Sequence, residues 1–311
     1  MAMTTRDLPV GKQLAPARLD VFFSLFTVEF RKQCFRPRTY VILGAMAVLP
    51  LLITMALLIS GPGHPERVQA LLVVPSSSGM TLWVIALAST EKFFIPLVIA
   101  LFAGEAMTGE ASWGSLRYIL AGSNPRTTVL ASKTAVAAIL CVAAIATLCA
   151  ASLVVGFLAF GFAPLSVTVA KTVSFTSAIG QFGGASTHVS LTSVPVAVEK
   201  MALAALYTGA LSITIFSCAL LASVISDKPI IAIATGAGLA VVSWTLQTDA
   251  IPGLKFFAPY TPTHGVGLWQ WLLVSPVSTA GMAGFLVKQA IYSGIFLSVA
   301  FWWFGRKEIH S

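Results

Sequence analysis

Six long runs of mostly apolar residues constrain the fold of this chain more than any other feature. A helix that crosses a lipid bilayer needs about 20 such residues in a row, and only helices and closed β-barrels pair every backbone group inside lipid. The six runs therefore predict an all-α protein that crosses a membrane six times. They cover residues 41–60, 82–104, 129–161, 201–224, 229–248 and 284–304.

The overall composition favours a membrane protein over a soluble one. Hydrophobic residues make up 57% of the chain and charged residues only 10%, whereas a soluble domain carries about 25% charged residues. The net charge of +8 could indicate nucleic acid binding, but the basic residues cluster at the ends of the apolar runs. We therefore attribute them to membrane orientation and expect no nucleic acid partner.

The lysines and arginines also predict how the six spans are oriented. Cytoplasmic loops of membrane proteins carry an excess of these residues. If the N-terminus is cytoplasmic, thirteen of them lie on the cytoplasmic side and four on the outer side. We therefore expect both termini in the cytoplasm, and a multi-pass protein of the plasma (inner) membrane.

Residues 1–40 are expected to form a cytoplasmic N-terminus with an amphipathic helix before the first span. One face of this helix would be apolar and the other polar. The apolar face contains Leu19, Phe22, Phe23, Phe26 and Phe30, and the polar face contains Asp20, Ser24, Thr27 and Arg31. Such a helix is predicted to lie in the inner membrane interface, with a packed surface helix as the alternative.

Two long segments between spans are expected on the outer side. In residues 163–198, polar residues alternate with apolar ones in stretches that Gly180, Gly183 and Gly184 separate. This pattern predicts a small β-hairpin, with a disordered Ser/Thr-rich loop as the alternative. Residues 249–283 are rich in proline and aromatic residues, which predicts broken, partly re-entrant helices at the outer leaflet.

A charged segment punctuated by glycines separates the second apolar run from the third, and its ionisable groups must lie outside the lipid. Its elements follow in the order Gly104-Glu105, Gly109-Glu110, Gly114-Ser115-Leu116-Arg117, Pro125-Arg126 and Lys133. This ordered set resembles the cytoplasmic loop of the permeases of type-2 ABC transporters, where the permease meets its ATPase.

The resemblance implies a function for the chain and partners for it. Residues 41–311 would form the six-span permease domain of an ATP-driven exporter, and the charged segment would contain a coupling helix between spans 2 and 3. The expected partners are cytosolic ABC ATPase subunits, a second permease copy or paralogue, and membrane lipids. The ATPase-coupling residues would be Glu105, Glu110, Gly114, Ser115, Leu116, Arg117, Pro125 and Arg126.

The chain itself has no sequence motif for binding ATP. A GxxxxGK[ST] loop, which holds nucleotide phosphates, does not occur in the sequence. We therefore expect that this chain is not an enzyme and binds no cofactor or metal, and that ATP and Mg²⁺ are bound by the partner ATPase.

Three charged residues are predicted inside the membrane, where ionised groups are costly. Glu91 and Lys92 fall near the middle of the second apolar run, and Lys288 falls in the last run. They are candidates for a translocation pathway, and Lys288 is the expected ion-pair partner of Glu91. The alternatives are a purely structural ion pair between helices and a later start of the second span.

The fifth run carries small residues at intervals of four, at Ala232, Gly236 and Ala240. Such a stripe permits close approach of two helices, either within one permease or across a dimer.

The sequence leaves two other functions open beside the exporter. Glu91, Lys92 and Lys288 could serve an ion- or proton-coupled secondary transporter, and the outer hairpin could serve a membrane scaffold or sensor. For an exporter, the apolar spans favour an amphipathic or hydrophobic cargo such as a lipid, drug or peptide.

Overall fold

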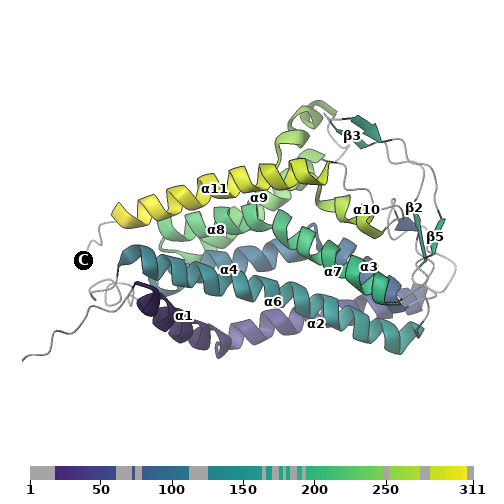
Figure 1. Cartoon of the computed structure of the whole chain (residues 1–311), viewed down its shortest axis with the longest axis horizontal. Helices are drawn as coiled ribbons and strands as arrows, with labels where there is room; N and C mark the ends of the chain where they lie inside the picture. The colour runs from purple at the N-terminus through teal and green to yellow at the C-terminus, as the bar shows by residue number, and fades with distance from the viewer. Residues whose placement is uncertain are drawn as a thin grey trace, which may run out of the picture.

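The fold is a bundle of long helices with two small sheets at one end (Figure 1). The computed structural model describes residues 18–60, 72–73, 79–111, 125–162, 166–169, 175–177, 180–182, 188–190, 194–247, 252–273 and 281–306. Within these residues, six helical stretches are long and apolar enough to cross a membrane. They are Pro37–Ile59, Phe94–Ala111, Arg126–Phe160, Pro195–Ile225, Pro229–Gln247 and Met282–Arg306. The prediction of a helical protein with six helices of spanning length is thus confirmed.

The helices follow the chain in an order close to the predicted one. The first is α1 (Arg18–Cys34), which precedes the spans as expected. The others are α2 (Pro37–Ser60), α3 (Gly79–Thr90), α4 (Phe94–Ala111), α6 (Arg126–Phe160), α7 (Val194–Leu211), α8 (Ile213–Ile225), α9 (Pro229–Gln247) and α11 (Met282–Arg306).

The predicted continuous span over residues 82–104 is wrong. A turn at residues 91–93 divides it into α3 and α4, and Phe94–Ala111 is the part long enough to span. The physical reason is Pro96, in the first turn of α4. Its ring would clash with the carbonyl of Lys92 if the helix continued through this point, and it has no N–H to donate.

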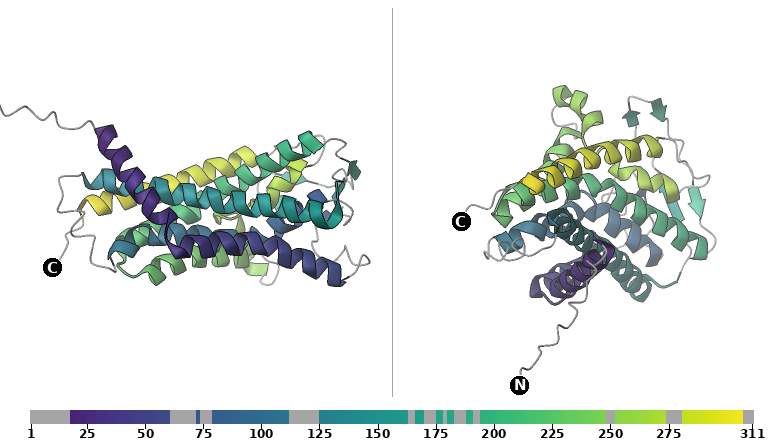
Figure 2. Two further views of the ribbon diagram at one scale, coloured as in Figure 1. Left: turned by 90° about the horizontal axis from the view of Figure 1, so that it is seen from below. Right: turned by 60° about the vertical axis from the view of Figure 1, so that its left-hand side comes forward.

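The helix α4 lies at the centre of the bundle. It packs against α6, α8 and α9, while α2 and α3 also pack against α6. Figure 2 shows α1 crossing the bundle obliquely before α2 begins. One end of the molecule contains α1, the C-terminal ends of α4 and α11, and the start of α6 (Figure 1).

The stripe of small residues on α9 is buried inside this chain. Ala232, Gly236 and Ala240 are all buried. A Cβ atom added to Gly236 would lie 2.7 Å from the Cβ of Ala219 in α8 and 2.9 Å from that of Ala100 in α4. The stripe therefore permits close packing within one chain, which was one of the two predicted possibilities.

The segment over residues 163–198 contains strands, but their pairing differs from the prediction. Strands β1 (Leu72–Val73), β2 (Ser166–Val169) and β5 (His188–Ser190) form an antiparallel sheet in the order β1-β2-β5. Strands β3 (Phe175–Ser177) and β4 (Gly180–Phe182) form a separate antiparallel pair. Gly180 is therefore part of a strand, and β1 comes from a segment with no predicted strand. Both sheets lie at the end of the bundle away from α1 (Figure 1).

The proline- and aromatic-rich segment forms short helices. These are the 3₁₀ helices η2 (Pro252–Tyr260) and η3 (Val266–Trp269), followed by α10 (Gln270–Leu273). Side chains of the neighbouring spans hold the segment in place. Gln247 of α9 donates to the hydroxyls of Thr261 and Thr263, at 3.0 and 2.8 Å.

Candidate functional site at the junction of α1, α4 and α6

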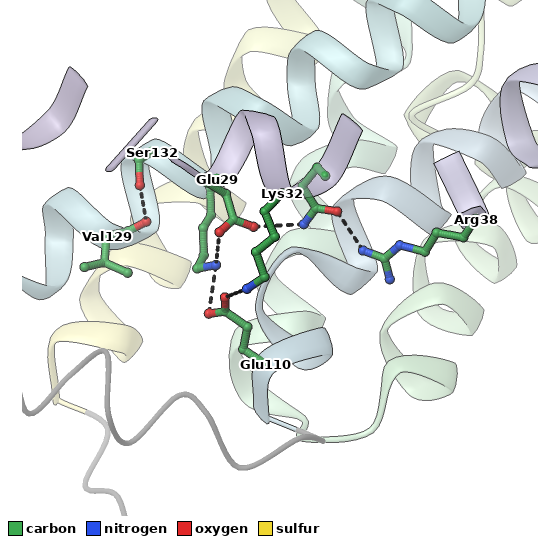
Figure 3. A network of polar contacts seen from close by, with 8 residues as sticks. Glu29, Lys32, Arg38, Glu110, Val129 and Ser132 are labelled. Carbon is green, nitrogen blue, oxygen red and sulfur yellow. Dashed lines mark hydrogen bonds and ion pairs between the residues drawn. The ribbon is translucent and has the colours of Figure 1, made fainter. Parts of the chain in front are cut away.

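A buried network of charged side chains joins α1 to the two helices that flank residues 112–124 (Figure 3). Lys133 of α6 is its centre. The Nζ atom of Lys133 lies 3.0 Å from Oε2 of Glu29 in α1 and 2.8 Å from Oε2 of Glu110 in α4. Lys32 of α1 reaches the other oxygen of Glu110 at 2.5 Å. Lys133 and its two glutamate partners thus connect three helices.

A second set of contacts extends the network to α2. Gln33 donates from Nε2 to Oε1 of Glu29 at 2.9 Å, and its own Oε1 accepts from Nη2 of Arg38 at the same distance. Arg38 also forms an ion pair with Glu105 of α4. Thr39 donates to the backbone carbonyl of Gln33 at 2.8 Å, which fixes the turn between α1 and α2.

The centre of the network is buried. The side chains of Lys133 and Glu110 are 4% and 3% exposed, whereas that of Lys32 is 40% exposed. Buried charges are tolerated in proteins when they are paired and hydrogen-bonded. Burial acts most strongly on Glu29 and raises its pKa, but the charge of Lys133 and hydrogen bonds from Lys133 and Gln33 together outweigh it. The pKa of Glu29 therefore lies below its ordinary value, and the group is ionised.

A small cavity adjoins the network on the inner side of α1. Its polar lining is Glu29, Gln33, Arg38 and Lys133, and its apolar lining is Phe102, Ala106, Ala137 and Leu140. The space open to the centre of a water molecule is about 10 Å³, which is room for about one water. The site is thus a closely packed junction of charges, too small for a cargo molecule.

The predicted coupling residues fall into three groups. Glu105 and Glu110 belong to the network. Because the side chain of Glu110 is buried, it does not present its charge to a docking partner, contrary to its predicted coupling role. Pro125 precedes α6, where its carbonyl accepts from the N–H of Thr128 at 3.0 Å, and Arg126 is exposed. Gly114, Ser115, Leu116 and Arg117 lie outside the described residues.

The two glycines of the predicted motif in α4 differ in how closely they are packed. A Cβ atom on Gly104 would lie 3.0 Å from the backbone nitrogen of Ile233, so this glycine permits α9 to approach. A Cβ atom on Gly109 would lie 3.7 Å from Nη1 of Arg36 and 4.0 Å from Nη1 of Arg38, which is ordinary contact, so this position would accept a small side chain.

Sequence reasoning missed Glu29, Lys32, Gln33 and Arg38 as site residues. The available signal was the spacing of Glu29 and Gln33, since residues four apart lie on the same face of a helix. That face also carries the half-buried Phe22 and Phe26. A carboxylate and an amide on the packed face of an amphipathic helix indicate partners on the helices beneath it.

The three charged residues predicted inside the membrane are not brought together. Glu91 is buried in the turn between α3 and α4, and its carboxylate accepts a hydrogen bond from Nε1 of Trp269. Lys288 instead donates to the carbonyl of Pro259 at 3.0 Å, and Lys92 is exposed. The expected ion pair between Glu91 and Lys288 is therefore wrong.

An aromatic donor takes the place of the cation because η3 packs against the turn. Trp269 is fully buried and lies edge-on to Trp83 of α3, with ring centroids 5.9 Å apart. The nitrogen of a buried indole needs an acceptor, and Glu91 supplies it. Lys288 lies beside η2 with its ammonium 5.1 Å from the ring centroid of Phe285.

No protein-family model matches its sequence, and the search of curated proteins found no significant match.

Proposed function

We propose that this chain is the permease subunit of a type-2 ABC exporter, in a plasma (inner) membrane. Two features support the proposal: six helices of spanning length and the ordered residues from Gly104 to Lys133. In this proposal both termini and residues 112–124 face the cytoplasm. The two small sheets and the segment from η2 to α10 lie at the outer side, where that segment is partly re-entrant.

The observation that carries the proposal furthest is the ion-pair network around Lys133. It joins α1 to the end of α4 and to the start of α6, which are the helices on either side of residues 112–124. A partner that displaces those residues would move both helix ends together. Because α4 packs against α8 and α9, the displacement would pass into the centre of the bundle.

The energy would come from outside this chain. ATP and Mg²⁺ would be bound by cytosolic ATPase subunits, and the permease would act with a second copy or a paralogue. The chain would make and break no covalent bond. Its packed apolar helices suit an amphipathic or hydrophobic cargo such as a lipid, a drug or a peptide.

The position of the charges refines the proposed coupling role. Glu110, Glu105 and Lys133 would transmit movement inside the permease rather than contact the ATPase directly. The contact would involve the exposed Pro125 and Arg126. Gly114, Ser115, Leu116 and Arg117 of the motif would also take part.

The test is purification of the tagged full-length chain from its native membranes in a mild detergent. An exporter permease should retain an ABC ATPase, and the reconstituted complex should hydrolyse ATP. Arg126→Glu should reduce that hydrolysis while leaving the permease folded. The matched control is Lys228→Glu, which reverses an exposed cation in the turn between α8 and α9. Recovery of the folded chain without any ATPase, in repeated purifications, would overturn the proposal.

A second candidate function rests on Glu91. A buried carboxyl group held by an indole, in a turn between two apolar helices, is also suited to proton-coupled transport. Uptake or efflux by vesicles separates the two functions. An ATP-driven exporter needs nucleotide on the ATPase side and tolerates a collapsed proton gradient, whereas a proton-coupled transporter fails without the gradient and loses activity in Glu91→Gln.

A further inference from the structure

One face of α1 leaves apolar side chains exposed. Glu29 and Gln33 point into the network, where Glu29 holds α1 against α6, whereas Leu19 and Phe23 of α1, and Phe35 just after it, are 60–70% exposed. Aromatic and aliphatic side chains at this exposure are stable when an apolar phase covers them. This exposed face thus has the properties of a helix that contacts lipid.

Arg31, in the last turn of α1, and Arg36, in the turn between α1 and α2, carry positive charge that no described carboxylate neutralises. Among the described residues, the ion pairs of this region involve the cations Lys32, Arg38 and Lys133, and none involves Arg31 or Arg36. Nη1 atoms of Arg36 and Arg38 both approach Gly109, and Glu105 pairs with Arg38. Arg36 thus places a guanidinium group beside that of Arg38 without a carboxylate partner of its own among the described residues, which favours the approach of an anion.

A separate observation places this end of the molecule at a membrane surface. Trp302 and Trp303 are 54% and 43% exposed near the end of α11, at the same end of the bundle as α1 (Figure 1). Arg306 lies over the ring of Trp302, 4.5 Å from its centroid. Exposed tryptophans gather at the boundary between lipid and water, so the turn after α1 lies near the lipid headgroups.

We propose that Arg31 and Arg36 bind the phosphate of an anionic membrane phospholipid whose acyl chains pack against Phe23 and Phe30. Guanidinium groups match phosphate oxygens with paired hydrogen bonds, and the exposed rings supply the apolar surface. The site depends on the position of α1 at the interface, but not on ATP, an ATPase or the cargo. It goes beyond the proposed function, and either can fail without the other.

The test uses the full-length chain in a neutral detergent, titrated with phosphatidylglycerol or with phosphatidylcholine, and follows its thermal unfolding. Phosphatidylglycerol should raise the unfolding midpoint in a saturable manner, and phosphatidylcholine should have a much weaker effect. Arg31→Gln with Arg36→Gln should weaken the apparent affinity for phosphatidylglycerol roughly 100-fold, at about tenfold for each lost hydrogen bond to the charged phosphate. Should the double variant not fold, Arg31→Gln alone should show the tenfold effect.

The matched control is the pair Lys228→Gln and Arg306→Gln, which removes two exposed cations from the same end of the molecule. It should change the affinity by less than about threefold, because those residues lie outside the site. Equal losses in the two double variants would mean diffuse attraction and would overturn the proposal. An equal response to phosphatidylcholine, or to inorganic phosphate without lipid, would overturn it as well.

Discussion

At the scale of single residues, Lys133 has the greatest influence on the junction of α1, α4 and α6. Its buried ammonium contacts carboxylates from two other helices. Removing one partner of a buried ion pair leaves the other charge in a poorly solvated place, which typically costs more than the pair contributes.

The first prediction is that Lys133→Met strongly destabilises the protein, by about 3–5 kcal/mol. The measurement is the unfolding of the full-length chain in detergent. The control is Lys32→Met, which removes another cation from Glu110 at a position where 40% of the side chain is exposed. Exposed ion pairs contribute about 0–1 kcal/mol, so a similar loss in both variants would contradict a central role for Lys133.

The second prediction concerns Glu91 and Trp269. Trp269→Phe keeps an aromatic ring but removes the donor, leaving a buried carboxyl group without its hydrogen bond, at a cost of about 1–3 kcal/mol. Glu91→Gln and Trp269→Phe should therefore show non-additive effects in a double-mutant cycle. Glu91→Gln and Lys288→Met should be additive, because Lys288 donates to Pro259 instead. Coupling of Glu91 to Lys288 and not to Trp269 would refute this assignment.

The residues of the site were only partly predictable from the sequence. Glu105, Glu110 and Lys133 stood out because they belong to an ordered motif. Glu29 did not, because its role depends on which side of α1 packs against α6, and the sequence of α1 alone does not specify its neighbour. Pairing of Glu91 with an indole was equally hidden, since Trp269 is 178 residues away in the chain.

At the scale of elements, the spans follow from apolar length, and their interruptions follow from local chemistry. Pro96 indicated the interruption between α3 and α4. The apolar run over residues 82–104 nevertheless had the length of one span, so a continuous helix was predicted. The helical stretch of the fourth span is likewise interrupted at Ser212, between α7 and α8. The hydroxyl of Ser212 donates to the carbonyl of Thr208 at 2.9 Å. Pairing of β1 with β2 depends on the folding of distant segments, and the alternation of side chains in a strand does not identify its partner.

The third prediction tests how α9 packs. Gly236→Ala should destabilise the protein by about 1–3 kcal/mol, because the new methyl group meets Ala219 and Ala100 in a filled space. Gly238→Ala is the control on the same helix, since a Cβ atom there would have no neighbour within 4 Å. It should be neutral or slightly stabilising, as alanine favours a helix over glycine. Thermal unfolding of both variants distinguishes the tightly packed face of α9 from its open face.

At the scale of the whole molecule, the described long helices alternate in direction, as six consecutive membrane spans require. The turn between α8 and α9 lies at the same end as α1, and the two sheets lie at the opposite end (Figure 1). The positions of the long helices were predictable because lipid requires about 20 apolar residues for each. The absolute orientation is inferred from the distribution of the basic residues alone.

The last prediction therefore concerns orientation. With the four native cysteines replaced, a cysteine at Ser177 in β3 should react with a membrane-impermeant maleimide in intact cells. A cysteine at Lys228, in the turn between α8 and α9, should react only after the membrane is permeabilised. The excess of lysine and arginine at the end that contains Lys228 motivates this expectation. The reverse pattern would place α1 and residues 112–124 outside the cell, where no cytosolic ATPase could reach them, and labelling of both cysteines in intact cells would exclude six spans in the assigned order.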